Sequence, residues 1–359
     1  MASKKSEESD WSTAAPHEPR PSARRRAAAS ASDPVQGSLI ELPQADPRPR
    51  RFESLWDTHL AIEAEDAWKS GEVGFICRAL VQATLPYREP KDSPPAWGRS
   101  NGKVSLVIQP GYYFKREEVV TGKKKVVQQL PVSLGYPYGS IPRLLLAWIG
   151  REVKLKKERE IALGNSLVSF MAELGMNNAT GGKNGSITRL REQMRRLFSA
   201  KIAILDNPDP SAIDWRSDGF VLVDKSQIWW DPKVPHQEDL FDSRIQLSER
   251  FYEELVSSPV PVDMRALRDL KNSPSALDLY CFLTYRMFTL RKETTIPWEV
   301  LKMQFGSEIA NPRKFKWQFQ QALKSVLVVY PEAKVDLSPT GLILKPSKTS
   351  VRSLKQNAA

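Results

Sequence analysis

Histidine and cysteine are scarce in this chain, and the few that occur are scattered. The three histidines, His17, His59 and His236, stand alone in the sequence. No histidine pair is therefore available to bind a metal ion or to build a relaxase-type active site. The two cysteines, Cys77 and Cys281, lie far apart in apolar sequence, which is typical of buried thiols in a reducing cytosol.

Long apolar runs and catalytic motifs are absent as well. No stretch approaches the roughly 20 apolar residues that a membrane-spanning helix needs, and the N-terminus lacks the apolar region of a secretory signal. Neither GxSxG nor GxGxxG occurs, and GGKNGS resembles a phosphate-binding loop only superficially, because Asn184 follows Lys183. We therefore expect a cytoplasmic protein that is not an enzyme, needs no cofactor or metal, and acts by binding.

Positive charge is abundant, with a formal net charge of +11, and two segments carry it. Residues 183–201 contain six basic residues and one acidic residue, and residues 313–355 contain nine basic residues and two acidic ones. Positive charge concentrated in this way predicts a polyanionic partner. A membrane surface would favour a basic helix with a free apolar face, whereas the apolar stripes of both segments are expected to face cores. The expected partner is therefore nucleic acid, and no membrane.

The first 137 residues contain no recognisable catalytic or ligand-binding motif. Residues 1–51 are rich in Ala, Ser, Pro and Arg and have few large apolar residues, so we expect a disordered basic tail. The three consecutive arginines at 24–26 are either simply solvated, which we favour, or make nonspecific phosphate contacts. Residues 52–137 predict a small mixed α/β element that packs on or orients the rest of the chain. Its expected parts are a helix over 52–69, strands over 74–85 and 103–114, and a hairpin tip at Lys123–Lys125.

Residues 138–244 predict a first winged-helix domain. Apolar residues at helical spacing indicate three helices, and Ser186 is expected to cap the third because serine hydroxyls bond first-turn amides. Glycines supply the tight turn before it. Ser140 is expected to cap the first helix, Leu167 to Leu174 lie in the second, and the third spans 186–198. A strand-like link over 152–163 and a hairpin formed by 201–205 and 219–230 complete the domain.

The same order of elements recurs in residues 273–348, after connecting helices within 245–272. Ser273 caps and Pro274 opens the first helix, whereas Asn311 caps and Pro312 opens the third. A second helix over 296–306 and a hairpin over 333–347, with Gly341 at its turn, follow the same pattern. The chain thus predicts an α+β fold of tandem winged-helix domains, with a flexible tail over 349–359.

The third helix of each predicted domain carries a polar, cationic face opposite its apolar stripe. Such a helix suits a major groove, where arginine pairs with guanine and glutamine with adenine, and lysine contacts phosphate. Residues 186–198 taken alone are equally compatible with a solvated basic helix. The predicted DNA-binding residues are Lys183, Ser186, Thr188, Arg189, Arg191, Arg195, Arg196, Arg313, Lys314, Trp317, Gln320, Gln321, Lys324 and Lys345.

Trp317 is unusual among these residues because it projects almost opposite the apolar stripe of its helix. Two interpretations remain open. The ring packs on the neighbouring domain or on the wing, which we favour, or it contacts a thymine methyl group or a sugar.

Four segments together resemble the plasmid-encoded RepA replication initiator family, and the resemblance covers about residues 70–347. They are YGSIPRLLLAWI (138–149), EIALGNSLVSFMAELGM (160–176), GGKNGSITRLREQMRRLF (181–198) and ALDLYCFLTYRM (276–287). The resemblance implies an initiator that binds repeated double-stranded DNA sites (iterons) at a plasmid origin and helps open an adjacent A·T-rich region. It also implies recruitment of the host replication initiator and helicase, and control of copy number. Related initiators repress their own promoter as dimers, so a homodimer is left open.

Two other classes of protein remain as alternatives. A dimeric winged-helix transcriptional regulator would have the same basic helices without initiator activity. A structural or partition adaptor is less favoured, because both basic segments fall on candidate recognition helices.

Overall fold

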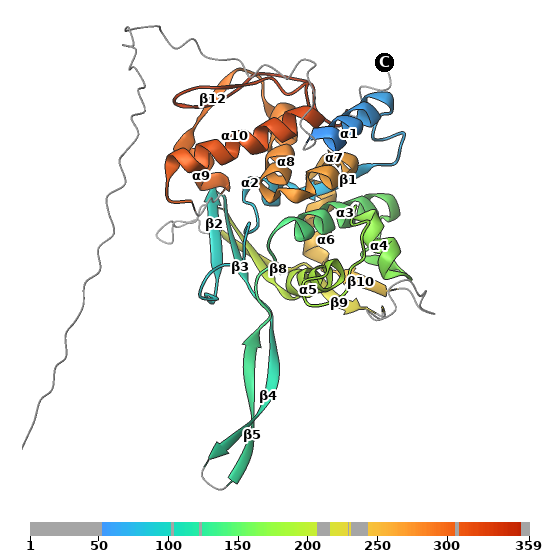
Figure 1. The fold of residues 1–359 in the computed structure, drawn as a ribbon, viewed down its shortest axis with the longest axis vertical. Helices are drawn as coiled ribbons and strands as arrows, with labels where there is room; N and C mark the ends of the chain where they lie inside the picture. Colours follow the sequence, from blue (N-terminus) through green and yellow to red (C-terminus); the bar gives the residue numbers. More distant parts are fainter. Residues whose placement is uncertain are drawn as a thin grey trace, which may run out of the picture. The chain divides into compact units, whose positions relative to one another are not determined.

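Helices and strands are interspersed along the chain, so the fold is of the mixed α and β kind that the sequence predicts (Figure 1). The computed structural model describes residues 52–101, 104–121, 124–206, 216–228, 230, 243–305 and 309–352. The predicted basic tail over 1–51 and most of the predicted tail over 349–359 lie outside the described residues. None of the helices within the described ranges is long and apolar enough to cross a membrane.

The segment before the first module contains two helices and five strands. The predicted strand over 74–85 is wrong in its second half, where RALVQ is helical because Arg, Ala, Leu and Gln favour helices. The predicted strand over 103–114 is two strands, because Pro110 lacks an amide hydrogen and breaks the ladder. The elements are α1 (Glu53–Ala64), β1 (Val73–Cys77), α2 (Arg78–Gln82), β2 (Trp97–Asn101), β3 (Val104–Gln109), β4 (Tyr112–Thr121) and β5 (Lys124–Ser133).

In its described residues, the first module has three helices and a three-stranded sheet in the order β6-β10-β9. The predicted cap at Ser140 is wrong: Gly139 is the N-cap of α3, and Ser140 lies inside the helix. The predicted strand-like link over 152–163 is wrong in its first part, where α3 continues to Lys156. Lys154 and Lys156 stabilise this last turn because they lie at the negative end of the helix dipole. The elements are α3 (Ser140–Lys156), β6 (Glu160–Gly164), α4 (Leu167–Glu173), α5 (Ser186–Ser199), β9 (Val223–Gln227) and β10 (Ser243–Leu247).

The strands that come after α5 depart from the prediction. The hairpin of β7 (Lys201–Asp206) and β8 (Arg216–Val221) forms, but it joins β2 and β3 in a four-stranded sheet. Ile202 in β7 is buried opposite Ile108 in β3, and this apolar pairing explains the choice of sheet. The sheet of the first module instead uses β9 with β10, a strand that the sequence did not reveal.

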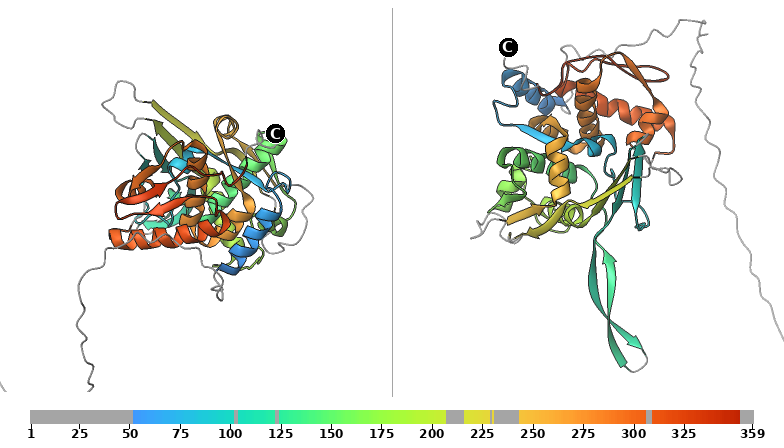
Figure 2. Two further views of the ribbon diagram at one scale, coloured as in Figure 1. Left: turned by 90° about the horizontal axis from the view of Figure 1, so that it is seen from above. Right: turned by 180° about the vertical axis from the view of Figure 1, so that it is seen from behind.

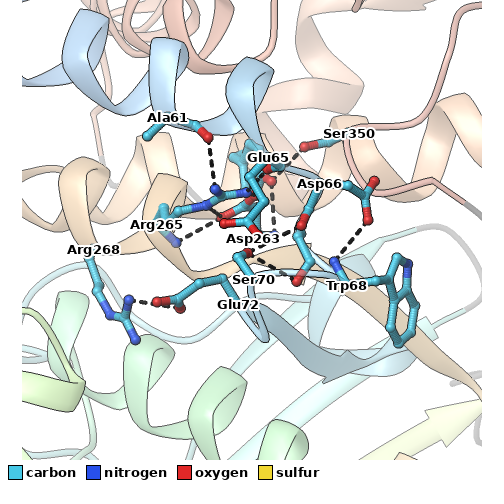
Figure 3. A network of polar contacts seen from close by, with 12 residues as sticks. Ala61, Glu65, Asp66, Trp68, Ser70, Glu72, Asp263, Arg265, Arg268 and Ser350 are labelled. Carbon is cyan, nitrogen blue, oxygen red and sulfur yellow. Dashed lines mark hydrogen bonds and ion pairs between the residues drawn. The ribbon is translucent and has the colours of Figure 1, made fainter.

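The segment between the modules contains α6 (Glu249–Ser257), β11 (Pro259–Asp263) and α7 (Met264–Asp269). The sequence predicts only connecting helices in this segment. This is wrong for β11, which is a strand and pairs antiparallel with β1. Figure 3 shows the polar network at the end of this ladder: the buried carboxylate of Asp263 accepts from Arg265, whose guanidinium also donates to the carbonyls of Ala61 and Glu65. This network ties α1 to the paired strands.

The second module repeats the order of elements found in the first, apart from the β7–β8 hairpin that follows α5 in the first. Ser273 and Asn311 accept hydrogen bonds from first-turn amides of their helices, which confirms both predicted caps. The three strands lie in the order β12-β14-β13, so the last strand is central, as it is in the first module. The elements are α8 (Pro274–Thr289), β12 (Thr294–Pro297), α9 (Trp298–Phe305), α10 (Pro312–Val329), β13 (Val335–Leu337) and β14 (Gly341–Leu344).

Candidate nucleic-acid interface

The third helix of the first module, α5, presents a cationic surface. Its apolar stripe is buried as predicted, and this orients the opposite face outward. Arg189, Arg191 and Arg195 are exposed there, and Lys183 is exposed in the preceding turn. Within the described part of the chain, these four side chains make no hydrogen bond or ion pair. Their charges are therefore available to a ligand.

The turn that leads into α5 is held by two hydroxyl groups that the sequence had assigned to DNA. The predicted N-cap is wrong: Gly185 is the N-cap, and Ser186 lies inside the helix. The Ser186 hydroxyl donates to the Asn178 carbonyl at 2.6 Å and accepts from the Thr180 amide at 2.9 Å. Thr188 Oγ1 donates to the Gly182 carbonyl at 2.7 Å. The turn folds back over the helix start, so both hydroxyls find backbone partners there.

Arg196 is also occupied within the protein. Its Nη1 lies 2.6 Å from Glu89 Oε1, it donates to the Tyr136 carbonyl, and its guanidinium lies 5.3 Å from the centre of the Tyr138 ring. The side chain is largely buried. Arg196 therefore fastens α5 to the preceding segment, and we leave it out of the candidate surface.

A groove separates α5 from the neighbouring strand β9. Arg191 and Arg195 line its helical side, and Val223 and Ser226 line its strand side. Asp224 also lies in the groove, but its carboxylate is paired with Arg159 at 2.9 Å. Glu192 lines the groove as well, so α5 and β9 frame a groove that carries both guanidinium and carboxylate groups.

The third helix of the second module, α10, presents a similar surface. Its predicted apolar stripe, which includes Phe315 and Phe319, is buried. The predicted contact residues on this helix all reach the surface: Arg313, Lys314, Trp317 and Lys324 are exposed, and Gln320 and Gln321 are half-buried. In Lys345, just after β14, the ammonium group forms an ion pair with Asp336 at 2.5 Å. That hydrogen bond and the charge of Asp336 raise the pKa of Lys345.

Trp317 remains 59% exposed, so it does not pack tightly on either neighbour that the sequence suggested. With Lys314 and Gln321 it lines a groove whose other wall includes Tyr87, Arg88, Glu89 and Lys91. The ring is therefore available to a ligand on the same face as two other predicted contact residues.

A buried ion pair joins the two modules, and the sequence pattern did not predict it. Arg143 in α3 makes two hydrogen bonds to Asp278 in α8, from Nε at 2.7 Å and from Nη2 at 2.8 Å. Nη2 also donates to the Leu85 carbonyl at 2.7 Å. Burial lowers the pKa of Arg143, but the charge and hydrogen bonds of Asp278 outweigh it, so the net pKa is raised. The available signal was a single charged residue within an apolar part of each helix: Arg143 within residues 141–149 of α3 and Asp278 within residues 274–285 of α8.

The segment around residues 85–91 contacts both modules. Its carbonyls bind Arg143, Glu89 binds Arg196 on α5, and Tyr87 and Lys91 line the groove beside α10. The sequence assigned no role to this segment. This segment therefore lies between α5 and the groove beside α10.

These features define a two-module protein in which each module exposes a cationic third helix. Residues 136–300 match the family described as plasmid encoded RepA protein, which confirms the predicted resemblance over that part of the chain. The match is narrower than the predicted range of 70–347.

Two crystal structures of domains 2 and 3 of RctB are similar to this chain. A selenomethionine derivative is 11% identical, with a TM-score of 0.41 over 71% of this chain and 84% of that one. A second structure, of RctB residues 155–483, is 10% identical, with a TM-score of 0.41 over 74% of this chain and 96% of that one. No curated protein sequence matches the chain.

Proposed function

We propose that the protein is a plasmid replication initiator that binds repeated double-stranded DNA sites at a plasmid origin. The observation that carries the proposal is the pair of modules with the same element order, each exposing a cationic third helix. The match of residues 136–300 to the plasmid encoded RepA family supports it. In this proposal each module is a winged helix, with the paired strands β9–β10 and β13–β14 as the wings.

In this proposal, α5 and α10 each enter a major groove of one DNA duplex. Arg189, Arg191 and Arg195 pair with guanine or contact phosphate, and each good base pairing contributes about 1–3 kcal/mol of discrimination. On α10, Gln320 and Gln321 read adenine, while the basic residues position the helix on phosphates. The protein acts by binding and straining the DNA rather than by cleaving a bond, and it requires no cofactor.

Occupation of several repeats would bend the origin DNA, and opening would be least costly at flexible A·T-rich steps. Recruitment of the host initiator and helicase, control of copy number and repression of its own promoter are implied by the RepA resemblance and belong to the same proposal.

The first experiment measures binding to the DNA that naturally flanks the coding sequence. Fluorescence anisotropy over a range of salt concentrations compares the wild type with Arg189→Gln/Arg195→Gln. We expect weaker binding and a slope of log affinity against log salt that is smaller by about 2, because two phosphate or base contacts are lost.

The control is Arg78→Gln/Arg352→Gln, which removes the same charge from exposed positions outside both third helices. Equal losses in both double variants would refute the assignment of α5. A plasmid that carries only the protected DNA, tested for replication when the protein is supplied in trans, separates an initiator from a transcriptional regulator.

A further inference from the structure

Strands β4 and β5 form a long ribbon that extends away from the packed helices (Figure 1 and the right view of Figure 2). They pair antiparallel over ten residue pairs, from Tyr112↔Ser133 to Thr121↔Lys124. Among the described strands, no third strand pairs with either of them. A two-stranded ribbon alone is at best marginally stable in water. A ribbon of this length therefore points to a partner outside the chain.

The base of the ribbon lies against the end of α5. Gly111 approaches Ser199, the last residue of α5, so closely that an added Cβ would lie 2.4 Å from the serine side chain. The Leu134 amide donates to the Gly111 carbonyl at 2.8 Å and closes the base. The position of the ribbon is therefore coupled to the candidate DNA-binding helix.

The ribbon carries more positive than negative charge. Lys115 and Arg116 lie in its first half, and Lys124 and Lys125 lie in register positions at its far end. Of the two acidic residues, Glu117 is paired with Lys115 at 3.4 Å. At the base, three aromatic side chains are exposed: Tyr112 by 55%, Tyr113 by 45% and Phe114 by 67%. Basic residues beside exposed apolar rings are typical of ribbons that bind DNA.

We propose that the ribbon is an arm that binds the DNA flanking the site contacted by α5. This inference rests on the proposed function. Ten residues at about 3.3 Å each span roughly 33 Å, close to one helical turn of DNA, ~34 Å. The far end of the ribbon, where Lys124 and Lys125 lie in register, then meets the DNA backbone one turn away from α5, and the aromatic side chains at the base contact sugars. The other obvious partner is a further strand that pairs with the edge of β5. The lysines and Pro131 on β5 disfavour it, because lysine and proline on an edge strand oppose such pairing.

The test compares two duplexes that share the footprinted site. One has flanks of about two helical turns, roughly 20 base pairs, and the other is trimmed flush with the major grooves occupied by α5 and α10. The proteins are the wild type, Lys124→Gln/Lys125→Gln and a control, Lys69→Gln/Lys292→Gln, which neutralises two exposed lysines outside the ribbon and both third helices. Melting temperature and molar mass by light scattering are measured for each protein.

We expect the wild type to bind the flanked duplex about tenfold more tightly than the trimmed one. The ribbon variant should lose this advantage, with a salt slope smaller by about 2 on the flanked duplex and unchanged affinity for the trimmed duplex. The control should behave as the wild type does. Equal affinity of the wild type for both duplexes would refute the proposal that the ribbon binds flanking DNA, but it would not contradict the proposed function.

Two further outcomes would also overturn the arm. A ribbon variant with altered molar mass but normal binding to flanked DNA would identify the ribbon as a contact with a second protein copy. A wild type that binds neither duplex would refute the proposed function, and the arm with it.

Discussion

Arg143 and Asp278 show how two residues can determine the relation between two modules. Both side chains are buried, and Asp278 supplies the carboxylate that pairs with the Arg143 guanidinium. Removing one member of such a pair leaves an uncompensated buried charge, which costs more than the pair contributes. The ion pair is therefore a point at which the arrangement of the modules can be tested.

Asp278→Ala should lower the free energy of unfolding by about 3–5 kcal/mol, because the Arg143 guanidinium stays buried without its carboxylate. Urea denaturation measures the change. Glu160→Ala is the control, since it removes an exposed pair with Arg244 at 2.8 Å and should cost no more than about 1 kcal/mol. Similar losses in both variants would contradict the structural role of the buried pair.

The two cysteines are free and buried, as the sequence predicts. Burial raises the pKa of Cys77 from 9.0 to about 12 and also raises the pKa of Cys281. Above pH 9 the unfolded chain loses thiol protons that the folded protein keeps, so the free energy of unfolding should fall as the pH rises towards 12. Urea denaturation at a series of pH values should show a shallower decline for Cys77→Ala/Cys281→Ala. If the free energy of unfolding fell equally with pH in the wild type and in the double variant, the buried thiols would not be the cause of the decline.

At the scale of the element, the start of α5 depends on a close backbone approach. A Cβ on Gly185 would lie 2.2 Å from the Thr180 carbonyl oxygen and 2.3 Å from that of Gly181. Backbone atoms cannot yield as a flexible side chain can. The turn over 178–186 and the helix therefore require glycine at this position, whatever ligand the helix binds.

Gly185→Ala should shift the turn and destabilise the protein by about 1–3 kcal/mol, the usual cost of overpacking. Because Lys183 lies in that turn, affinity for DNA should fall as well. Gly181→Ala is the matched control: an added Cβ there meets nothing within 4 Å. Thermal denaturation and anisotropy titration on both variants measure the two effects, and an unaffected Gly185 variant would show that the turn adapts.

At the scale of the whole molecule, the proposal predicts the pattern of protection on DNA. The buried ion pair between Arg143 and Asp278 joins the modules, so α5 and α10 should occupy successive major grooves on one face, roughly one turn or 10 base pairs apart. Hydroxyl-radical footprinting of one protein on one repeat should show two protected segments. Arg189→Gln/Arg195→Gln should weaken one segment and Arg313→Gln/Lys314→Gln the other. Protection of a single groove would refute the two-module interpretation.

Local pattern was enough to place most helices and the faces that they expose. Apolar residues at helical spacing located α4, α5, α8 and α10, and the Ser-Pro and Asn-Pro pairs located two helix starts, because these signals act within a few residues of sequence. The cationic faces of α5 and α10 result from the same spacing. They are properties of short segments, so a single sequence reveals them.

Contacts between distant segments depended on the tertiary structure. Whether β7 joins β3 or β6, whether residues 243–247 form a strand, and whether Arg196 faces solvent or Glu89 all turn on partners far away in the sequence. By itself the sequence determined two modules with cationic third helices and two thiols in apolar surroundings. The tertiary structure alone decided which hydroxyls and guanidiniums are already occupied and how the modules are joined. The burial and pairing of a side chain depend on which segments pack together, and the local periodicity of a sequence does not show which segments those are.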